Sequence, residues 1–183
     1  MSILKVARLG HPVLRQVSRP VPPDALASAE VQGFIDDLVE TMREYDGAGL
    51  AAPQVHRPLR ICLIEVDDNP RYPDFPRVPL TLLVNPRIDL LTDDRIRIWE
   101  GCLSVPDLRG LVPRCPHIHV RAVDRHGAAL DFEAEGVFAG IVQHECDHLD
   151  GRLFVDRVED TKTLSFIPEF RRYRADEPHV VTD

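Results

Sequence analysis

The sequence lacks any apolar run of the ~20 residues that a membrane-spanning helix needs. It also lacks a segment of the signal-peptide type, because residues 1–5 lead directly into patterned sequence. No paired C-x-x-C spacing relates its four cysteines, which are Cys62, Cys102, Cys115 and Cys146. We therefore expect a soluble cytoplasmic protein with reduced thiols. Its 183 residues predict a single domain over 1–183 that buries a core without disulfides.

Basic residues are in the minority, since 22 Lys and Arg against 30 Asp and Glu give a formal charge of −8. Nucleic-acid backbones are bound mostly through basic side chains, so this balance disfavours non-specific nucleic-acid binding. The sequence has no basic stripe beyond Arg171, Arg172 and Arg174 near its end. We expect neither direct nucleic-acid readout nor a membrane partner.

The first half of the chain contains one helical and two strand patterns. Apolar residues at helical spacing predict a helix over roughly 28–45, with Ser28 as its N-cap. Continuous apolar runs predict buried strands at 60–66 and 80–84. The Pro- and Asp-rich segment 67–79 between them is expected to be a surface loop.

The second half predicts a hairpin, a helix and a tail. Alternating residues at 117–124 and 128–133 favour paired strands, and the period then changes to that of a helix from Glu135 to Gly151. The short tail from about 167 is polar, and we expect its last ~10 residues to be frayed. The sequence therefore predicts an α+β fold, with antiparallel or mixed strands packed around a central helix.

The string HECDH at 144–148 predicts a metal site on that central helix. His144 and His148 are four residues apart, so they differ by about 40° around the helix axis and can reach one ion. Glu145 lies beside them, as in sites where a metal activates water and a carboxylate moves the proton. Chance would produce this pattern in about 2% of such sequences. The apolar flanks favour the metal site, because unpaired buried histidines are costly.

A catalytic metal usually has three protein ligands, and three positions compete to supply the third. A histidine six residues after His148 would match one protease pattern, but Phe154 occupies that position and excludes it. Glu169 resembles the ligand of thermolysin-like endopeptidases in its spacing, and it is one alternative. Cys102 is the other, because a thiolate binds zinc or ferrous iron well and Gly101 lets the backbone come close. A lone cysteine is otherwise typical of a buried core.

A third string, GAGLAAPQ at 47–54, follows the first helix. Gly47 and Gly49 permit a tight backbone path, and the amide of Gln54 can donate to a developing oxyanion. Taken alone, the string is more typical of a turn.

Together, the strings GAGLAAPQ, EGCLS and HECDH resemble the three motifs of the peptide deformylase family, GxGxAAxQ, EGCxS and HExDH, in the same order. Residues 10–15, Gln143, Arg109 and the run 112–114 also fit that family. The resemblance extends over roughly 5–158. It implies a deformylase-like fold and a metal-dependent hydrolase that removes the formyl group from the N-terminal formylmethionine of new polypeptides and releases formate.

The resemblance also implies roles for individual residues. Glu145 would transfer the proton, while the Gln54 amide and the Leu103 backbone N–H would stabilise the oxyanion. One divalent ion is implied, most often Fe²⁺, with Zn²⁺ or Ni²⁺ as alternatives that the ligand chemistry also suits. The three implied metal ligands are Cys102, His144 and His148.

A methionine pocket is expected on the helix face that carries His144. Val137, Gly140 and Ile141 precede it by seven, four and three residues and so share its face, where Gly140 leaves space. Core packing is the alternative for Val137 and Ile141. By similarity to the family, Ile98 is a further wall of the pocket. The other substrate-binding positions implied by the family are Gly47, Gly49 and Arg109.

Two further expectations concern the helix and the tail. Cys146 should face away from the metal, and we hypothesise that Asp147 pairs with Arg114 to orient the helix. N-formylmethionyl nascent peptides and the ribosome are the implied partners. Many bacterial deformylases dock on the ribosome through a long basic C-terminal helix, but here the tail after Phe166 is short and ends acidic. A catalytically silent metal-binding or ribosome-associated module is a rival class, against which the intact Glu145 argues.

Overall fold

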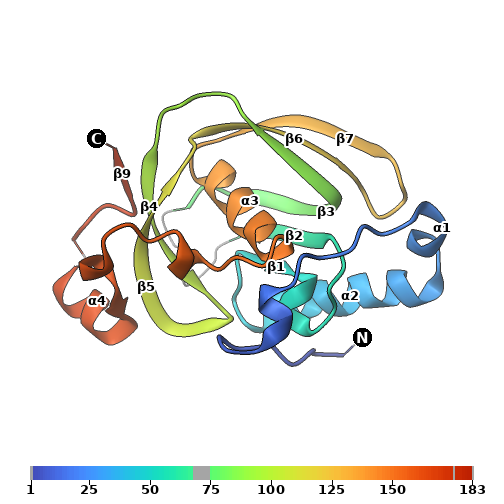
Figure 1. Cartoon of the computed structure of the whole chain (residues 1–183), viewed down its shortest axis with the longest axis horizontal. Coiled ribbons are helices and arrows are strands. Elements are labelled where there is room, and N and C mark those ends of the chain that lie inside the picture. The colour runs from blue at the N-terminus through green and yellow to red at the C-terminus, as the bar shows by residue number, and fades with distance from the viewer. Residues whose placement is uncertain (1, 68–74, 175, 183) are drawn as a thin grey trace.

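The computed structural model describes residues 2–67, 75–174 and 176–182, and it arranges two antiparallel sheets around one helix (Figure 1). The first sheet has the order β1-β2-β3-β6-β7. Its strands are β1 Gly49–Ala51, β2 Ile61–Val66, β3 Val78–Leu90, β6 His117–Val123 and β7 Ala129–Glu135. The second sheet has the order β8-β5-β4-β9. Its strands are β8 Ser165–Phe166, β5 Val105–Arg114, β4 Ile96–Cys102 and β9 Val180–Thr182.

The helix α3 (Gly136–Leu149) contacts strands of both sheets and lies at the centre of the molecule (Figure 1). Its residues Ala139, Val142 and Leu149 are fully buried in a core shared with the first sheet. Gln143 fixes the helix further, because its side chain accepts from the backbone N–H of Cys115 and donates to the carbonyl of the same residue. The α+β fold predicted from the sequence is confirmed.

The remaining helices lie around this centre. Helix α2 (Ala29–Glu44) begins at the predicted cap, where the Ser28 hydroxyl accepts from the N–H of Val31, and it buries an apolar face against β1 and β2. The short α1 (Pro23–Leu26) precedes it, and α4 (Ile167–Tyr173) lies against the second sheet. Four 3₁₀ turns complete the described elements, at Pro12–Arg15, Ala52–Val55, Phe154–Asp156 and Thr161–Thr163.

The tail is ordered, so the expected fraying is wrong for the residues described there. Strand β9 pairs antiparallel with β4, with Val180 opposite Ile98. The ring of Phe170 lies edge-on to Trp99 at 4.9 Å between centroids, and the guanidinium of Arg174 covers the same indole. The predicted loop 67–79 is too long at its C-terminal end, because strand β3 already begins at Val78. Residues 68–74 of this segment lie outside the described part of the chain.

All four cysteines are buried and free, as expected. Cys146 packs in the core with Cys62, which confirms that it does not belong to the metal-ligand group. Within the described part of the chain, no helix combines the length and the apolar character needed to cross a membrane.

Candidate active site

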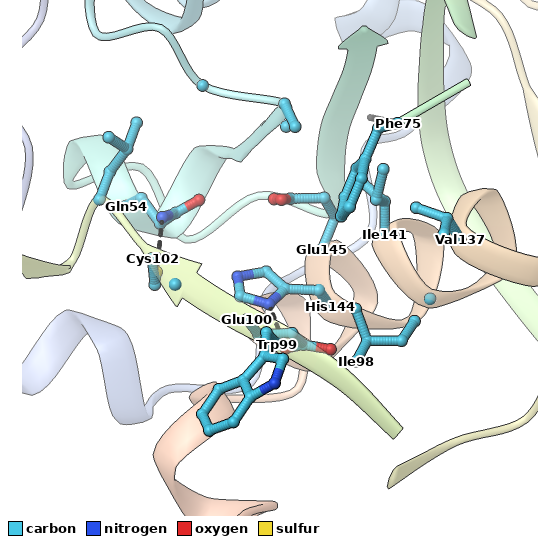
Figure 2. A pocket seen from close by; sticks show the side chains of 16 residues that line it. Gln54, Phe75, Ile98, Trp99, Glu100, Cys102, Val137, Ile141, His144 and Glu145 are labelled. Atoms are coloured by element: carbon cyan, nitrogen blue, oxygen red, sulfur yellow. Dashed lines mark hydrogen bonds and ion pairs between the residues drawn. The ribbon is translucent and has the colours of Figure 1, made fainter. Parts of the chain in front are cut away.

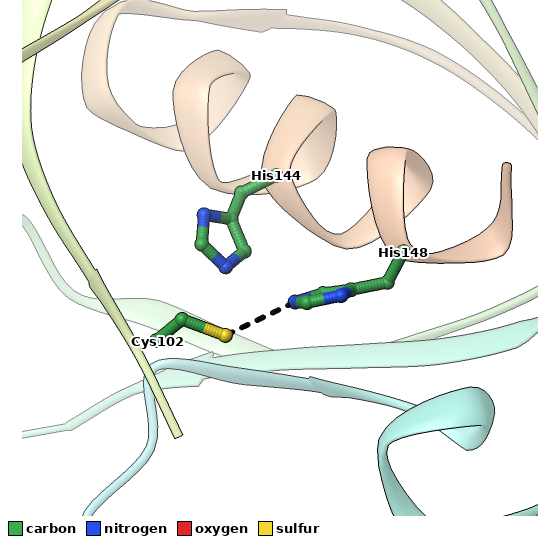
Figure 3. Close-up of side chains that lie close together, drawn as sticks. All are labelled: Cys102, His144 and His148. Carbon is green, nitrogen blue, oxygen red and sulfur yellow. Dashed lines mark hydrogen bonds between the residues drawn. The ribbon is translucent and has the colours of Figure 1, made fainter. Parts of the chain in front are cut away.

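The two histidines of α3 meet a cysteine at the end of β4 (Figure 3). One potential ligand atom each from Cys102, His144 and His148 lies within 4.8 Å of the others. The Sγ of Cys102 is 3.3 Å from Nε2 of His148. Cys102 on β4 lies 42 residues before His144 and 46 residues before His148, both on α3. The separate sequence strings could not establish that these three residues meet, and the structure brings them together. Glu169, the competing ligand, lies exposed on α4 and is not in this group.

The two histidines of this group differ in protonation. Burial would lower the pKa of His144, but its hydrogen bonds to Cys102 and Glu100 raise that pKa well above its usual value, so metal binding would displace a proton from it. Burial, followed by the positive charges of His144 and Arg114, holds the pKa of His148 well below its usual value, so its imidazole is neutral and has a lone pair to donate. His144 uses Nδ1 to contact Glu100 Oε2 at 2.8 Å, which leaves Nε2 for a ligand bond. A thiolate and two imidazoles are a donor set that fits zinc, ferrous iron or nickel.

The sulfur of Cys102 accepts two hydrogen bonds. The backbone N–H of Ser104 and the side-chain amide of Gln54 each donate to Sγ at 3.4 Å. The same Gln54 amide donates to the hydroxyl of Ser104 at 3.3 Å, while its oxygen accepts from the N–H of Ala51 at 2.8 Å. The bond from Ala51 therefore fixes the orientation of the amide, with its donor side toward the ligand group.

A buried ionic chain supports the ligand-bearing face of α3. Arg114 on β5 donates from Nε to Glu100 at 2.7 Å and from Nη1 to Asp147 at 2.6 Å. Asp147 also accepts from Arg157 at 2.5 Å. Burial alone would raise the pKa of Glu100, but the charges of Arg114 and His144 outweigh it and lower that pKa to about 2. The contact hypothesised between Asp147 and Arg114 is confirmed, whereas no role was predicted for Glu100, although it begins the string EGCLS.

Asp147→Ala is expected to weaken metal binding about 10–100-fold, the usual cost of losing a partner that orients a ligand shell. The substitution removes the carboxylate that joins Arg114 to Arg157. Arg114 then holds Glu100 less firmly, and Glu100 in turn orients His144 less firmly. Titration of the metal-free protein measures the change. The matched control is Asp131→Ala, because Asp131 is an exposed carboxylate that pairs with His119 on the first sheet. Unchanged metal affinity and activity in Asp147→Ala would show that the pair has no orienting role.

Glu145 is a buried carboxylate that faces the ligand group without belonging to it (Figure 2). Its Oε2 has no hydrogen-bond partner among the described residues. Burial, with the nearby charge of Glu100, raises its pKa to about 7 despite the opposing charges of His144 and Arg114. A carboxyl with this pKa can both accept and release a proton near neutrality. Gly49 makes room for it, because a Cβ there would be 2.4 Å from Oε1 of Glu145.

A pocket opens beside Glu145, between β4 and α3 (Figure 2). Most of the predicted substrate positions line it, as do Gln54 and Leu103; these positions are Gly47, Gly49, Ile98, Val137, Gly140 and Ile141. The space over Gly140 is filled rather than open, because a Cβ there would be 2.3 Å from Cδ1 of Ile98. This glycine therefore lets β4 approach α3. Arg109 is buried on β5 opposite Gly101 and is not among the lining residues.

Two aromatic walls of the pocket, Phe75 and Trp99, escaped the sequence analysis. Trp99 follows Ile98 on β4, and because successive strand residues face opposite sides of a sheet, assigning 96–102 as a strand would not by itself have predicted that Trp99 lines the pocket. Phe75 lies within the segment 67–79 that was predicted to be a surface loop, and it carries no local signal of its own.

Comparisons with known proteins agree with this geometry. A family model described as polypeptide deformylase matches residues 3–164. Peptide deformylase 1 of Bordetella pertussis is 47% identical over 161 residues, which cover 88% of this chain and 90% of that protein. Peptide deformylase 2 of Pseudomonas putida is 46% identical over 86% of this chain and 89% of its own length. The Met-Ala-Ser-bound crystal structure of a class I type b peptide deformylase from Acinetobacter baumannii is 39% identical, with a TM-score of 0.83 over 86% of this chain and 99% of that one.

Proposed function

The chain belongs to the polypeptide deformylase family, and on that premise we propose which residues carry out its reaction. The protein is a metal-dependent hydrolase that removes the formyl group from N-terminal formylmethionine of newly made polypeptides and releases formate. The observation that carries the residue assignment is the convergence of Cys102, His144 and His148 beside the buried carboxylate of Glu145, whose Oε2 has no hydrogen-bond partner in the described part of the chain.

Cys102, His144 and His148 would hold one divalent ion, and we propose Fe²⁺ as that ion, with Zn²⁺ and Ni²⁺ as alternatives. The neutral imidazole of His148 and the hydrogen-bonded sulfur of Cys102 support the ligand assignment. When bound, such an ion supplies Lewis acidity and makes water available as a nucleophile near neutral pH. Metal analysis of protein purified without oxygen distinguishes the three ions.

Glu145 would move the proton that this hydrolysis requires. It takes a proton from the attacking water and delivers it to the amine nitrogen as the formyl C–N bond breaks, so the products are formate and a free methionyl terminus. Its pKa of about 7 supports both halves of this transfer. The oriented amide of Gln54, with the backbone N–H of Leu103, would donate to the oxyanion that develops on the formyl carbonyl.

The methionine side chain would occupy the apolar pocket between β4 and α3. Gly140→Ala is expected to raise KM for formylmethionyl peptides about tenfold, since a displaced Ile98 would occupy space that the methionine needs. Steady-state kinetics on formyl-Met-Ala-Ser measure this. The control is Gly33→Ala on α2, where an added Cβ meets nothing within 4 Å. An unchanged KM in Gly140→Ala would place the methionine elsewhere.

We further propose that the enzyme works in the cytoplasm on chains that emerge from the ribosome. The C-terminal segment packs as α4 and β9 on the second sheet, so it is used within the fold, which argues against a docking arm made from it. The ribosome would supply substrate without that mode of attachment.

Formate release from formyl-Met-Ala-Ser, measured without oxygen on protein loaded with iron, nickel or zinc, tests the function. Release with at least one metal is expected. A thermolysin-like endopeptidase would instead cleave internal peptide bonds, and a silent metal-binding module would bind the ion without turnover. Absence of formate with all three metals would overturn the assignment.

A further inference from the structure

A second hollow adjoins the active-site pocket, and the two share Cys102 and Leu103 in their walls. Its volume of about 1040 Å³ can hold several amino-acid residues. Its charged and titratable lining is mostly basic, although the whole chain has a formal charge of −8. We call this hollow the basic groove; its basic members are Lys5, Arg8, His11, His56 and Arg171, and its one carboxylate is Asp107.

The permanent cations of the basic groove are not neutralised within the fold. Lys5, Arg8 and Arg171 are exposed, and none forms a salt bridge with another described residue. Several arginines elsewhere are paired, as Arg60 is with Asp150 at 2.7 Å. The groove therefore presents positive charge that a bound anion would meet directly.

The two histidines of the basic groove lie in the same positively charged environment. The rings of His11 and His56 meet edge-on with 4.7 Å between centroids. Burial, then the charges of His11 and Lys5, lower the pKa of His56. Part of this decrease in the pKa of His56 comes from positive charge, and a nearby anion would raise the pKa again.

The path of the substrate leads from the pocket to this groove. With the methionine side chain between β4 and α3 and the formyl group by Cys102, as proposed above, the following residues would leave between the edges 47–49 and 101–103, which line the pocket. Leu103 stands at the junction of the two hollows, and Tyr45 lies in the wall of the groove just before the 47–49 edge. Extended chain advances about 3.3 Å per residue, so residues beyond the second enter the groove.

We propose that the basic groove binds acidic side chains downstream of the formylmethionine, so that the enzyme prefers substrates with Asp or Glu beyond their second residue. The inference rests on the proposed function and adds a determinant of specificity to it. An acidic peptide is favoured over an RNA backbone as the occupant, because the groove opens from the wall of the catalytic pocket.

The test compares formyl-Met-Ala-Asp-Glu-Asp with its neutral isostere formyl-Met-Ala-Asn-Gln-Asn on the metal-loaded enzyme. At low salt kcat/KM should favour the acidic peptide about five- to tenfold, as expected for a few exposed ion pairs, and 0.5 M salt should remove most of the preference. The double variant Lys5→Glu/Arg8→Glu should abolish or reverse it. Arg87→Glu is the matched control, because Arg87 is exposed on β3 of the first sheet. This variant should leave the ratio of kcat/KM between the acidic and neutral peptides unchanged.

Formyl-Met-Ala-Ser separates this inference from the function on which it rests. Equal kcat/KM on the acidic and neutral peptides, with formyl-Met-Ala-Ser still hydrolysed, would overturn the acidic preference alone. No formate from any of the three peptides would overturn the function. A preference that survives in Lys5→Glu/Arg8→Glu while that variant loses retention on polyuridylate would assign the groove to nucleic acid and overturn the inference.

Discussion

Glu145→Gln is expected to lower kcat on formyl-Met-Ala-Ser by about 10³-fold, within the usual range for loss of a general acid–base group. The amide has nearly the same shape as the carboxylate, so it can occupy the space beside Gly49, but it cannot take up the water proton. Because Glu145 is not in the ligand group, the metal content should remain at one ion per chain. Formate release and elemental analysis of the same preparation measure the two quantities.

The control for this variant is Glu133→Gln on β7, where the carboxylate is exposed and pairs only with the surface histidine His117 among the contacts described. It should keep full activity. Loss of the metal together with activity in Glu145→Gln would show that Glu145 acts by supporting the ligands rather than by moving a proton. Retained activity would remove it from the mechanism.

The two long helices α2 and α3 could be predicted because their signals are local. Helix α2 has a serine cap and an apolar face at regular spacing, and α3 ends before Gly151, whose φ of 73° suits glycine. Strand β5 gives the opposite signal, because Pro106, Gly110 and Pro113 argue against a strand. The strand tolerates these residues because β8 pairs with it only at Leu108 and Arg109, which leaves the rest of that edge without a strand partner among the described residues.

The tail could not be predicted because its order comes from tertiary contacts. Its sequence is polar and has weak propensity for any regular structure. It becomes ordered where β4 offers an unpaired edge, so that the N–H of Trp99 donates to the carbonyl of His179 at 3.0 Å. Phe170 and Arg174 then cover the Trp99 indole. None of these partners is close in sequence, so no local pattern indicates the pairing.

The candidate site likewise has one part that local sequence predicts and another part that depends on tertiary contacts. The spacing of His144 and His148 expresses helix geometry, and it therefore predicts their approach without a structure. No role was predicted for Glu100, although it begins the string EGCLS, because acidic residues are ordinarily exposed, whereas here Glu100 is 7% exposed and paired with Arg114. Its role as the hydrogen-bond partner of His144 arises only when β4, β5 and α3 are assembled.

Cys102→Ser is expected to abolish metal binding under assay conditions. An alcohol is a poor ligand beside two imidazoles, and the loss should exceed the 10–100-fold that removal of a ligand's hydrogen-bond partner costs. Glu169→Ala should leave both metal affinity and formate release unchanged, because Glu169 is exposed on α4 and outside the ligand group. Titration of each metal-free variant, with formate release on the same samples, measures the contrast.

The two variants discriminate between the competing ligand sets because each removes one third ligand and leaves His144 and His148 in place. Metal loss in Cys102→Ser alone supports the Cys-His-His set. The reverse result would require α4 to move so that Glu169 reached the histidines, and that would break the contact of Phe170 with Trp99. Trp99 fluorescence therefore provides a second readout, since loss of the Phe170 contact should change the emission of the indole.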